Sequence, residues 1–283
     1  SATGRVVTNN GTFTKSGNCK IEGSSSNGST IVNNGTATIT AGTVSSTNYN
    51  AIYNGETSTT AKLTVSGGTI KSKEKGIVNK AKGTVTVTNG TITSTGQAVY
   101  NETEGTINIS GGAITSTGAN TIANGENATG TITISGGTID NTATDNAGRP
   151  CLINYNGNVV IKGNAKINSA FARTVLQYKA NGTIDIQGGT ITNSYTTQNN
   201  LSCYAVGAEA GTVKISGGTI TSKVANAVNI NAATVNISGG TISASNEDAI
   251  YCANANSKLN VSGGTITTTT SAGISIGNGT LTI

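Results

Sequence analysis

Residues 106–118, "TINISGGAITSTG", decide the fold, because the same pattern returns several times along the chain. It recurs as "TITISGGTIDNTA" at 131–143, "TVKISGGTITSKV" at 212–224 and "TVNISGGTISASN" at 234–246. A glycine loop that grips a phosphate needs a helix after the glycines to aim its amides at the ligand. Here a second alternating segment follows the glycines instead. The pattern therefore predicts a structural corner between two strands.

The apolar residue before this corner marks a repeat that runs the length of the chain. The gaps between successive markers are about 22 to 29 residues after a longer first gap, a variability that is typical of coils with inserted loops. The markers are Val7, Ile39, Val65, Val87, Ile109, Ile134, Ile161, Ile186, Ile215, Ile237, Val261 and Ile283. We therefore expect a single domain over residues 1–283, with residues 1–34 as an N-terminal cap or an atypical coil.

Each repeat contains three short segments with strand character. The first alternates with period two, as in 131–134, and the second follows the glycine pair, as in 219–221. The third has the form of "AIYN" at 51, "GIVN" at 76, "AVYN" at 98, "TIAN" at 121 and "CLIN" at 151. Three strands per coil predict an all-β parallel solenoid of about 10–11 coils spaced by about 4.8 Å. The alternation places Ile132 and Ile134 inside the coil and their threonine neighbours outside.

Asparagine ends the third segment in five successive repeats and shares the inward parity of the preceding Ile or Val. Later repeats carry Ile230, Cys252 and Ile276 at this position, which supports an inward side chain. We interpret the asparagines as a structural ladder whose amides bond from coil to coil, in preference to a polar ligand site. The ladder comprises Asn54, Asn79, Asn101, Asn124 and Asn154.

The "SGG-T-I" repeats resemble right-handed parallel β-helix proteins of the pectate-lyase-like superfamily, in particular bacterial cell-surface and secreted proteins. The resemblance implies a right-handed β-helix and a location outside the bacterial cell. It leaves the function open, because the superfamily includes polysaccharide lyases and hydrolases, adhesins and carbohydrate-binding proteins. Enzymes of this group use acidic clusters, which bind calcium or act as acid and base.

The composition disfavours catalysis. The chain has no His, and only 10% of its residues are charged, so we expect no cofactor, no metal site and no catalytic residues. A glycosidase needs two carboxylates across the scissile bond, yet Asp185 is the one acid predicted on the outer face of a first segment. The other Asp residues are 140, 145 and 248. Glu102, Glu104 and Glu126 share one predicted corner, where a solvated charge ladder is the simpler interpretation.

The repeat is most disturbed between Asp140 and Val206, where longer loops collect aromatic and basic residues. Loop insertions on a solenoid commonly carry its binding function. Tyr rings beside Arg and Lys donors suit a sugar, an acidic glycan above all, or a protein epitope. An alternative is that these aromatic side chains only seal enlarged corners. The candidate ligand-binding residues are Tyr155, Phe171, Arg173, Tyr178, Lys179 and Tyr195.

Two other surfaces have simpler explanations than binding. Outward Thr-x-Thr pairs resemble ice-binding solenoids, but Lys71, Ala113, Asp140, Asp185 and Lys214 interrupt the threonine columns. The lysines at 71, 73, 75, 80 and 82 could contact an anionic cell wall or glycan, although a solvated corner is the default interpretation. A net charge of +5 that is spread widely does not indicate a nucleic-acid partner.

The sequence thus predicts a non-enzymatic, extracellular bacterial surface β-helix that binds a glycan or a host or cell-surface protein. The alternatives are a polysaccharide lyase or glycoside hydrolase, a purely structural stalk and, last, an ice-binding protein. No apolar run reaches membrane-spanning length. The final repeat stops early, so we expect an uncapped C-terminal end. A longer surface polypeptide would continue beyond Ile283, or a second copy or a partner would cover that end.

Overall fold

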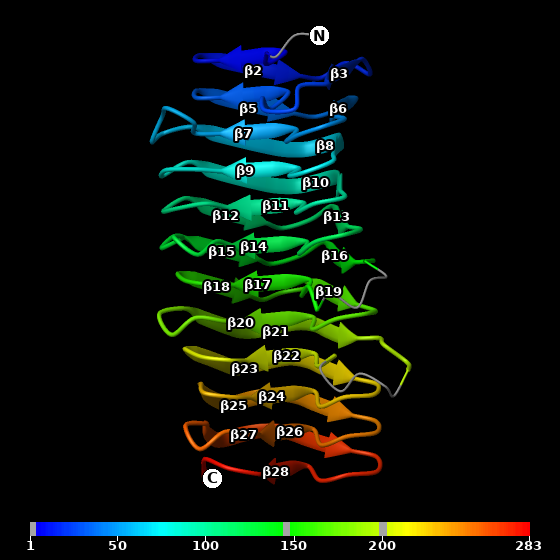
Figure 1. Ribbon diagram of the computed structural model, residues 1–283, viewed down its shortest axis with the longest axis vertical. Helices are drawn as coiled ribbons and strands as arrows, with labels where there is room; N and C mark the ends of the chain where they lie inside the picture. Colours follow the sequence, from blue (N-terminus) through cyan, green and yellow to red (C-terminus); the bar gives the residue numbers. More distant parts are fainter. Residues whose placement is uncertain (1–3, 144–147, 198–202) are drawn as a thin grey trace.

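The computed structural model describes residues 4–143, 148–197 and 203–283. In these residues the chain is all-β and contains no helix, and all strand pairs are parallel. They form a β-solenoid of about 11 coils, consistent with a right-handed parallel β-helix (Figure 1). The predicted fold class is therefore confirmed. No helix long and apolar enough to cross a membrane occurs in the described part of the chain.

The third segments of the repeats form one continuous parallel sheet, here called sheet A. Each of its strands has three residues and pairs in register with the strands of the neighbouring coils. Its strands are β1 (Val7–Asn9), β4 (Ile31–Asn33), β7 (Ile52–Asn54), β9 (Ile77–Asn79), β11 (Val99–Asn101), β14 (Ile122–Asn124), β17 (Leu152–Asn154), β20 (Val175–Gln177), β22 (Val206–Ala208), β24 (Val228–Ile230), β26 (Ile250–Cys252) and β28 (Ile274–Ile276).

The first and second segments form two further parallel layers, here called sheets B and C. Sheet B contains β2 (Thr12–Lys15), β5 (Thr36–Ile39), β12 (Thr106–Ile109), β15 (Thr131–Ile134), β18 (Asn158–Ile161) and β29 (Thr280–Thr282). Sheet C contains β3 (Lys20–Gly23), β6 (Thr43–Ser46), β13 (Ala113–Ser116), β16 (Thr138–Asn141) and β19 (Lys166–Ser169). Long bent strands run through both layers: β8 (Lys62–Ser72), β10 (Thr84–Ser94), β21 (Thr183–Asn193), β23 (Thr212–Ser222), β25 (Thr234–Ala244) and β27 (Lys258–Thr268).

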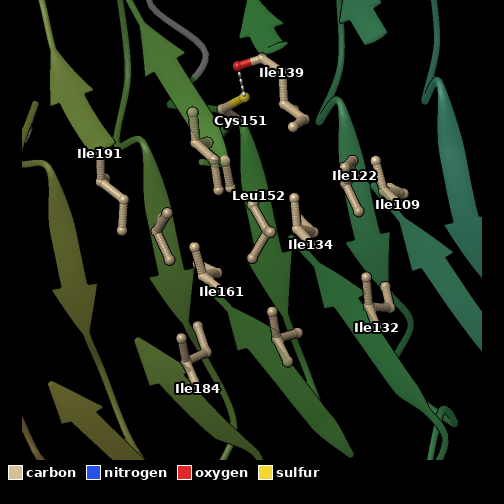
Figure 2. Packing of buried hydrophobic residues seen from close by; sticks show 14 of the residues in the cluster. Ile109, Ile122, Ile132, Ile134, Ile139, Cys151, Leu152, Ile161, Ile184 and Ile191 are labelled. Atoms are coloured by element: carbon tan, nitrogen blue, oxygen red, sulfur yellow. Dashed lines mark hydrogen bonds between the residues drawn. The ribbon is translucent and has the colours of Figure 1, made fainter. Parts of the chain in front are cut away.

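The core consists of columns of identical or similar apolar residues that stack from coil to coil. Ile109, Ile134 and Ile161 pair in register and are fully buried, and Figure 2 shows them in one row. Cys151 lies in the same interior, and its thiol is 3.5 Å from the carbonyl oxygen of Ile139. Burying one isoleucine side chain contributes about 1.5–3 kcal/mol. A single coil has no partner for its apolar face, so the stack itself creates the core.

The glycine pair of the repeated motif allows the coils to approach one another at the corner between sheets B and C. A Cβ on Gly136 would lie 2.4 Å from the carbonyl oxygen of Ser110 in the preceding coil. Gly137 has a φ of +84°, in the left-handed region that L-residues rarely adopt. Both glycines are therefore required by the backbone, one by space and the other by conformation. The motif is a structural corner.

A ladder of side-chain amides runs along the inside of sheet A. Asn54 Nδ2 donates to Asn79 Oδ1 at 2.9 Å, and Asn79 Nδ2 donates to Asn101 Oδ1 at 3.1 Å. The same contact continues through Asn124 and Asn154. It also begins earlier, at Asn9 and Asn33, and ends at Gln177, whose Oε1 accepts from Asn154 Nδ2 at 2.7 Å. The amides also donate to turn carbonyls, for example Asn101 Nδ2 to Gly105 O at 2.9 Å.

The first coil differs from the expectation at one marker. Val7 belongs to sheet A and pairs with Ile31, so its assignment as a sheet B marker was wrong. The equivalent of Ile39 is Lys15, a buried residue that lies at the N-terminal end of the apolar column. Its Nζ donates to Ala41 O at 3.1 Å and also contacts Gly17 O, so the ammonium group bonds to backbone carbonyls. Residues 7–23 thus form three strands of a regular coil.

Buried thiols predict that the protein loses stability at alkaline pH. Burial raises the pKa of Cys203 from its ordinary value of 9.0 to about 11, and it also raises the pKa values of Cys151 and Cys252. Between pH 9 and 11 the unfolded chain releases these protons before the folded chain does. The free energy of unfolding therefore falls as the pH rises through this window. Below pH 9 the contribution of the buried thiols to stability is fully present.

Urea denaturation at pH 7.5, 9 and 10.5 measures this effect, with Cys203→Ala as the control. The variant should show a shallower decline than the wild type, because one of the three buried thiols is absent. Equal stability of the wild type at pH 7.5 and 10.5 would contradict the expectation.

Candidate functional site

The outer face of sheet A carries a column formed by the middle residue of each strand. These residues point outward because the two ends of each three-residue strand face the core. Several of them are apolar yet hidden: Val78, Ile153 and Leu176 are each at most 4% exposed. Ala123, Ile153 and Leu176 form a small cluster outside the sheet, against which Tyr100 and Tyr155 pack. The tyrosines therefore cover a second, thin apolar layer on this face.

Polar contacts hold Tyr53 and Tyr100 in place on this face. Tyr53 Oη donates to Glu102 Oε2 at 2.7 Å. Burial, followed by this hydrogen bond, raises the pKa of Tyr53 well above its ordinary value. Lys80 Nζ lies 6.0 Å from the centroid of the Tyr53 ring, and Lys75 Nζ lies 5.3 Å from that of Tyr100. These rings are engaged by residues of the chain itself.

Three of the predicted binding residues meet at the edge of the stack where sheet A strands end, on the left in Figure 1. Tyr155 directly follows β17, and Tyr178 directly follows β20 in the next coil. Their ring centroids are 5.4 Å apart with an interplanar angle of 79°, and Lys179 Nζ lies 5.3 Å from the Tyr178 centroid. Tyr178 is 44% exposed, whereas burial raises the pKa of Tyr155. Tyr155, Tyr178 and Lys179 are here called the tyrosine corner.

A polar groove of about 340 Å³ lies at the same edge as the tyrosine corner. The residue after Tyr155, Asn156, lines this groove. Its Nδ2 donates to the backbone oxygen of Glu126. Carboxamides and one carboxylate dominate the lining, which comprises Glu126, Asn127, Thr129, Asn156, Gly157, Asn158 and Asn181. Carboxamides both donate and accept hydrogen bonds, which matches the mixed character of sugar hydroxyls. The groove and the rings thus lie at the same edge of the stack, and Asn156 connects them along the chain.

The other three predicted binding residues lie elsewhere. Phe171 and Tyr195 pack edge-to-face, with centroids 6.3 Å apart, in a cluster with Cys203 and Val224. This cluster lies at the opposite edge of the stack, where the chain enters sheet A, and Tyr195 is 7% exposed. The six residues therefore do not form one patch. Residues 144–147 and 198–202, which also belong to the loops predicted to bind, lie outside the described residues.

The backbone of Arg173 lies at that opposite edge, but its side chain extends over the outer face of sheet A. Its guanidinium carbon is 5.4 Å from the Tyr204 ring centroid, and its Nη2 is 3.7 Å from Glu209 Oε1. Gly207 makes room here, because a Cβ at this position would lie 2.9 Å from Leu176 Cδ1. Arg173 thus acts with Glu209 and Tyr204. Glu209 directly follows β22, and its backbone N–H donates to Gln177 O at 2.9 Å, so this ion pair lies one coil beyond Tyr178.

A second groove of about 510 Å³ lies beyond Arg173 on the same face. Its lining is formed by Tyr204, Glu209, Asn226, Asn229, Asn231, Glu247, Asp248, Tyr251 and Ala253. The sequence patterns indicated neither this groove nor the carboxamides of the first one. The sequence does contain a signal for the outer column of sheet A, because Tyr53, Tyr100 and Tyr251 occupy the same position of the third segment.

Several of the acidic residues have individual partners in the structure. Glu102 accepts from Tyr53, Glu104 lies 3.6 Å from Lys82, and Glu126 lines the groove. Asp185 Oδ2 accepts from Gln187 at 2.8 Å, and burial raises the pKa of Asp140. Within residues 4–143, 148–197 and 203–283, no group of three or more Cys, Asp or Glu residues could hold a metal ion. Asp145 lies outside the described residues.

The threonine columns are in register over the last four long strands. Thr190, Thr219, Thr241 and Thr265 pair in succession, and Ser243 replaces threonine in the adjoining column. Asp185 and Lys214 also pair directly with one another on sheet B. One uninterrupted run of paired threonines therefore lies on sheet C, whereas Asp185 and Lys214 interrupt the threonines of sheet B.

Comparisons with known proteins give no relative for this chain: no family model, curated protein or solved structure matches it. The resemblance to pectate-lyase-like proteins and to bacterial adhesins therefore remains a prediction.

Proposed function

We infer that the protein is a non-enzymatic, extracellular bacterial surface β-helix that binds a glycan at the tyrosine corner. One observation carries this function: an exposed Tyr178 ring, fixed edge-to-face by Tyr155, lies at the same edge as a groove lined by carboxamides. An aromatic face packs against the apolar C–H face of a sugar ring, while carboxamides bond its hydroxyls.

Preorganisation supports binding at this corner. The Tyr155 backbone N–H donates to Asn124 O at 3.0 Å, and that of Tyr178 donates to Asn154 O at 2.9 Å. Both rings are therefore attached directly to the last residues of rigid strands. A ligand would lose little of its binding free energy to the ordering of this surface.

The charges favour a neutral glycan or a glycan with few acidic groups. Lys179 is the cation at the tyrosine corner, and Glu126 faces the groove. Arg173, the second cation expected to attract an acidic glycan, is held by Glu209 instead. Adhesion to the glycans of a host or a neighbouring cell is the role that this site would serve. A host protein could be bound through its attached glycans.

The Tyr178→Ala variant should bind at least tenfold more weakly than the wild type to glycans identified on a glycan array. Loss of one exposed ring removes a contact of about 1.4 kcal/mol or more, which corresponds to this factor. Isothermal titration with the best array glycan measures the change. Tyr49→Ala is the control, because Tyr49 is partly exposed but lies before β7, at the opposite edge of the stack; it should stay within twofold.

Three outcomes would contradict the proposed function. Absence of binding to any array glycan would leave the solenoid as a stalk. Equal losses in Tyr178→Ala and Tyr49→Ala would remove the tyrosine corner as the site. Release of soluble products from a panel of pectin, alginate and host glycans would show an enzyme.

A further inference from the structure

A separate groove of about 730 Å³ lies on the outer face of sheet C near the N-terminal end of the stack. It crosses β3, β6 and β8, whose residues Glu22, Ser45 and Lys71 pair in one outward row. Hydroxyl groups and basic side chains dominate its lining. The residues are Lys20, Glu22, Thr43, Ser45, Ser46, Thr47, Lys71, Ser72, Lys73 and Thr95.

The charges in this groove are unbalanced. Lys20 Nζ lies 2.6 Å from Glu22 Oε1, so these two side chains neutralise one another. Lys71 and Lys73 are exposed, and neither forms an ion pair with any residue that the structure describes. The groove therefore has a local surplus of two positive charges beside several hydroxyl donors.

The lysines at positions 71–82 do not act as one patch. Lys75 and Lys80 lie over the rings of Tyr100 and Tyr53, and Lys82 pairs with Glu104 at 3.6 Å. These three lysines belong to the sheet A side of the molecule, where they have partners. Lys71 and Lys73 alone face the groove on sheet C.

We propose that the sheet C groove binds the oxyanion groups of an acidic polysaccharide, with Lys71 and Lys73 as the charged contacts. Lysine ammonium groups are compact point charges that suit sulfate, phosphate or carboxylate oxygens. The hydroxyls of Thr43 and Thr95 can donate further hydrogen bonds to the same groups, whereas those of Ser45 and Thr47 donate to Glu22 Oε1 and Gly23 O. The groove is open to solvent and has room for a polysaccharide chain that crosses several coils on this face. This site is independent of the tyrosine corner.

The repeat itself supplies a substitution that is compatible with the fold. Lys71 pairs with Ser45 on one side and Thr93 on the other, and Lys73 follows Ser72 as Thr47 and Thr95 follow Ser46 and Ser94. Threonine at both positions therefore matches neighbouring coils and keeps good strand propensity. The double variant Lys71→Thr/Lys73→Thr removes two charges and no core contact.

Heparin, a polysulfated polysaccharide, is the probe, and its affinity for the wild type and the double variant is measured at 50 and 200 mM NaCl. We expect the double variant to bind at least tenfold more weakly at 50 mM NaCl. The wild-type affinity should fall as the salt concentration rises. Lys80→Thr/Lys82→Thr has the same net charge as the double variant and should stay within twofold of the wild type.

Equal losses in the two double variants would overturn the proposal, because net charge alone would then explain binding. Absence of heparin binding at 50 mM NaCl would also overturn it. A DNA duplex of similar charge serves as a further arm: binding as tight as that of heparin would contradict an acidic polysaccharide as the ligand. Tyr178→Ala should bind heparin as the wild type does even when it has lost glycan binding, so the two proposals can fail separately.

Discussion

Replacing Asn101 with alanine is expected to lower the free energy of unfolding by about 3 kcal/mol, because each buried polar group left without a partner costs about 1–3 kcal/mol. Asn101 is fully buried and serves three partners at once. It accepts from Asn79 Nδ2 at 3.1 Å and donates to Asn124 Oδ1 and Gly105 O, both at 2.9 Å. The substitution leaves Asn124 Oδ1 and Gly105 O without their Asn101 donor, while Asn79 Nδ2 keeps its hydrogen bond to Gly83 O at 2.8 Å.

Urea denaturation followed by circular dichroism measures this change, with Asn108→Ala as the matched control. Asn108 lies on the outer face of β12 in the next part of the same coil, where its register partners are Thr86 and Thr133. Its replacement should change the free energy of unfolding by less than about 0.5 kcal/mol. Similar midpoints for the two variants would contradict the role of the ladder.

Replacing Gly136 with alanine is expected to cost about 3 kcal/mol, the upper part of the range for overpacked sites. The added methyl group would lie 2.4 Å from Ser110 O and 3.1 Å from the Ser110 carbonyl carbon. Both atoms belong to the backbone of the preceding coil, so the clash cannot be relieved by a side-chain rotation. The two coils must separate locally, which weakens the strand pairing on both sides of the corner.

Gly17→Ala is the control for this substitution. No atom lies within 4 Å of the Cβ position at Gly17, and Gly17 does not have a positive φ. Thermal unfolding of the two variants should therefore separate a destabilised Gly136→Ala from a Gly17→Ala that is close to the wild type. If both variants melt together with the wild type, the coils are not in close contact at the glycine pair.

Much of the architecture follows from local alternation. Ile132 and Ile134 were assigned to the interior by their period of two, and both are fully buried. The inward parity of Asn54 follows from the same rule, and its amide lies inside the coil. The rule failed at Val7, because "VTN" at 7–9 has the form of a third segment, such as "IVN" at 77. Lysine in place of an apolar residue at position 15 concealed the true sheet B strand.

The candidate site was less predictable from sequence. The loops after Gln177 and after Ser169 each carry one aromatic and one basic residue, but they lie at opposite edges of the stack. The edge that a loop occupies depends on the strand that precedes it. Between residues 140 and 206 the irregular spacing of the repeat obscures the assignment of these strands. The packing of Tyr204 beneath the Arg173 guanidinium depends on the missing side chain of Gly207, because a Cβ there would lie 3.2 Å from the Tyr204 ring. No local sequence pattern reveals this contact.

The most direct test of the central claim, a glycan bound at the tyrosine corner, uses tyrosine resonances. The chain has eight Tyr and no Trp, so selective ¹³C labelling of tyrosine gives a small set of signals to assign by single substitutions. On titration with the best array glycan, the signals of Tyr155 and Tyr178 should shift, while those of Tyr49 and Tyr195 should not. Saturable binding that leaves Tyr155 and Tyr178 unshifted would contradict the account.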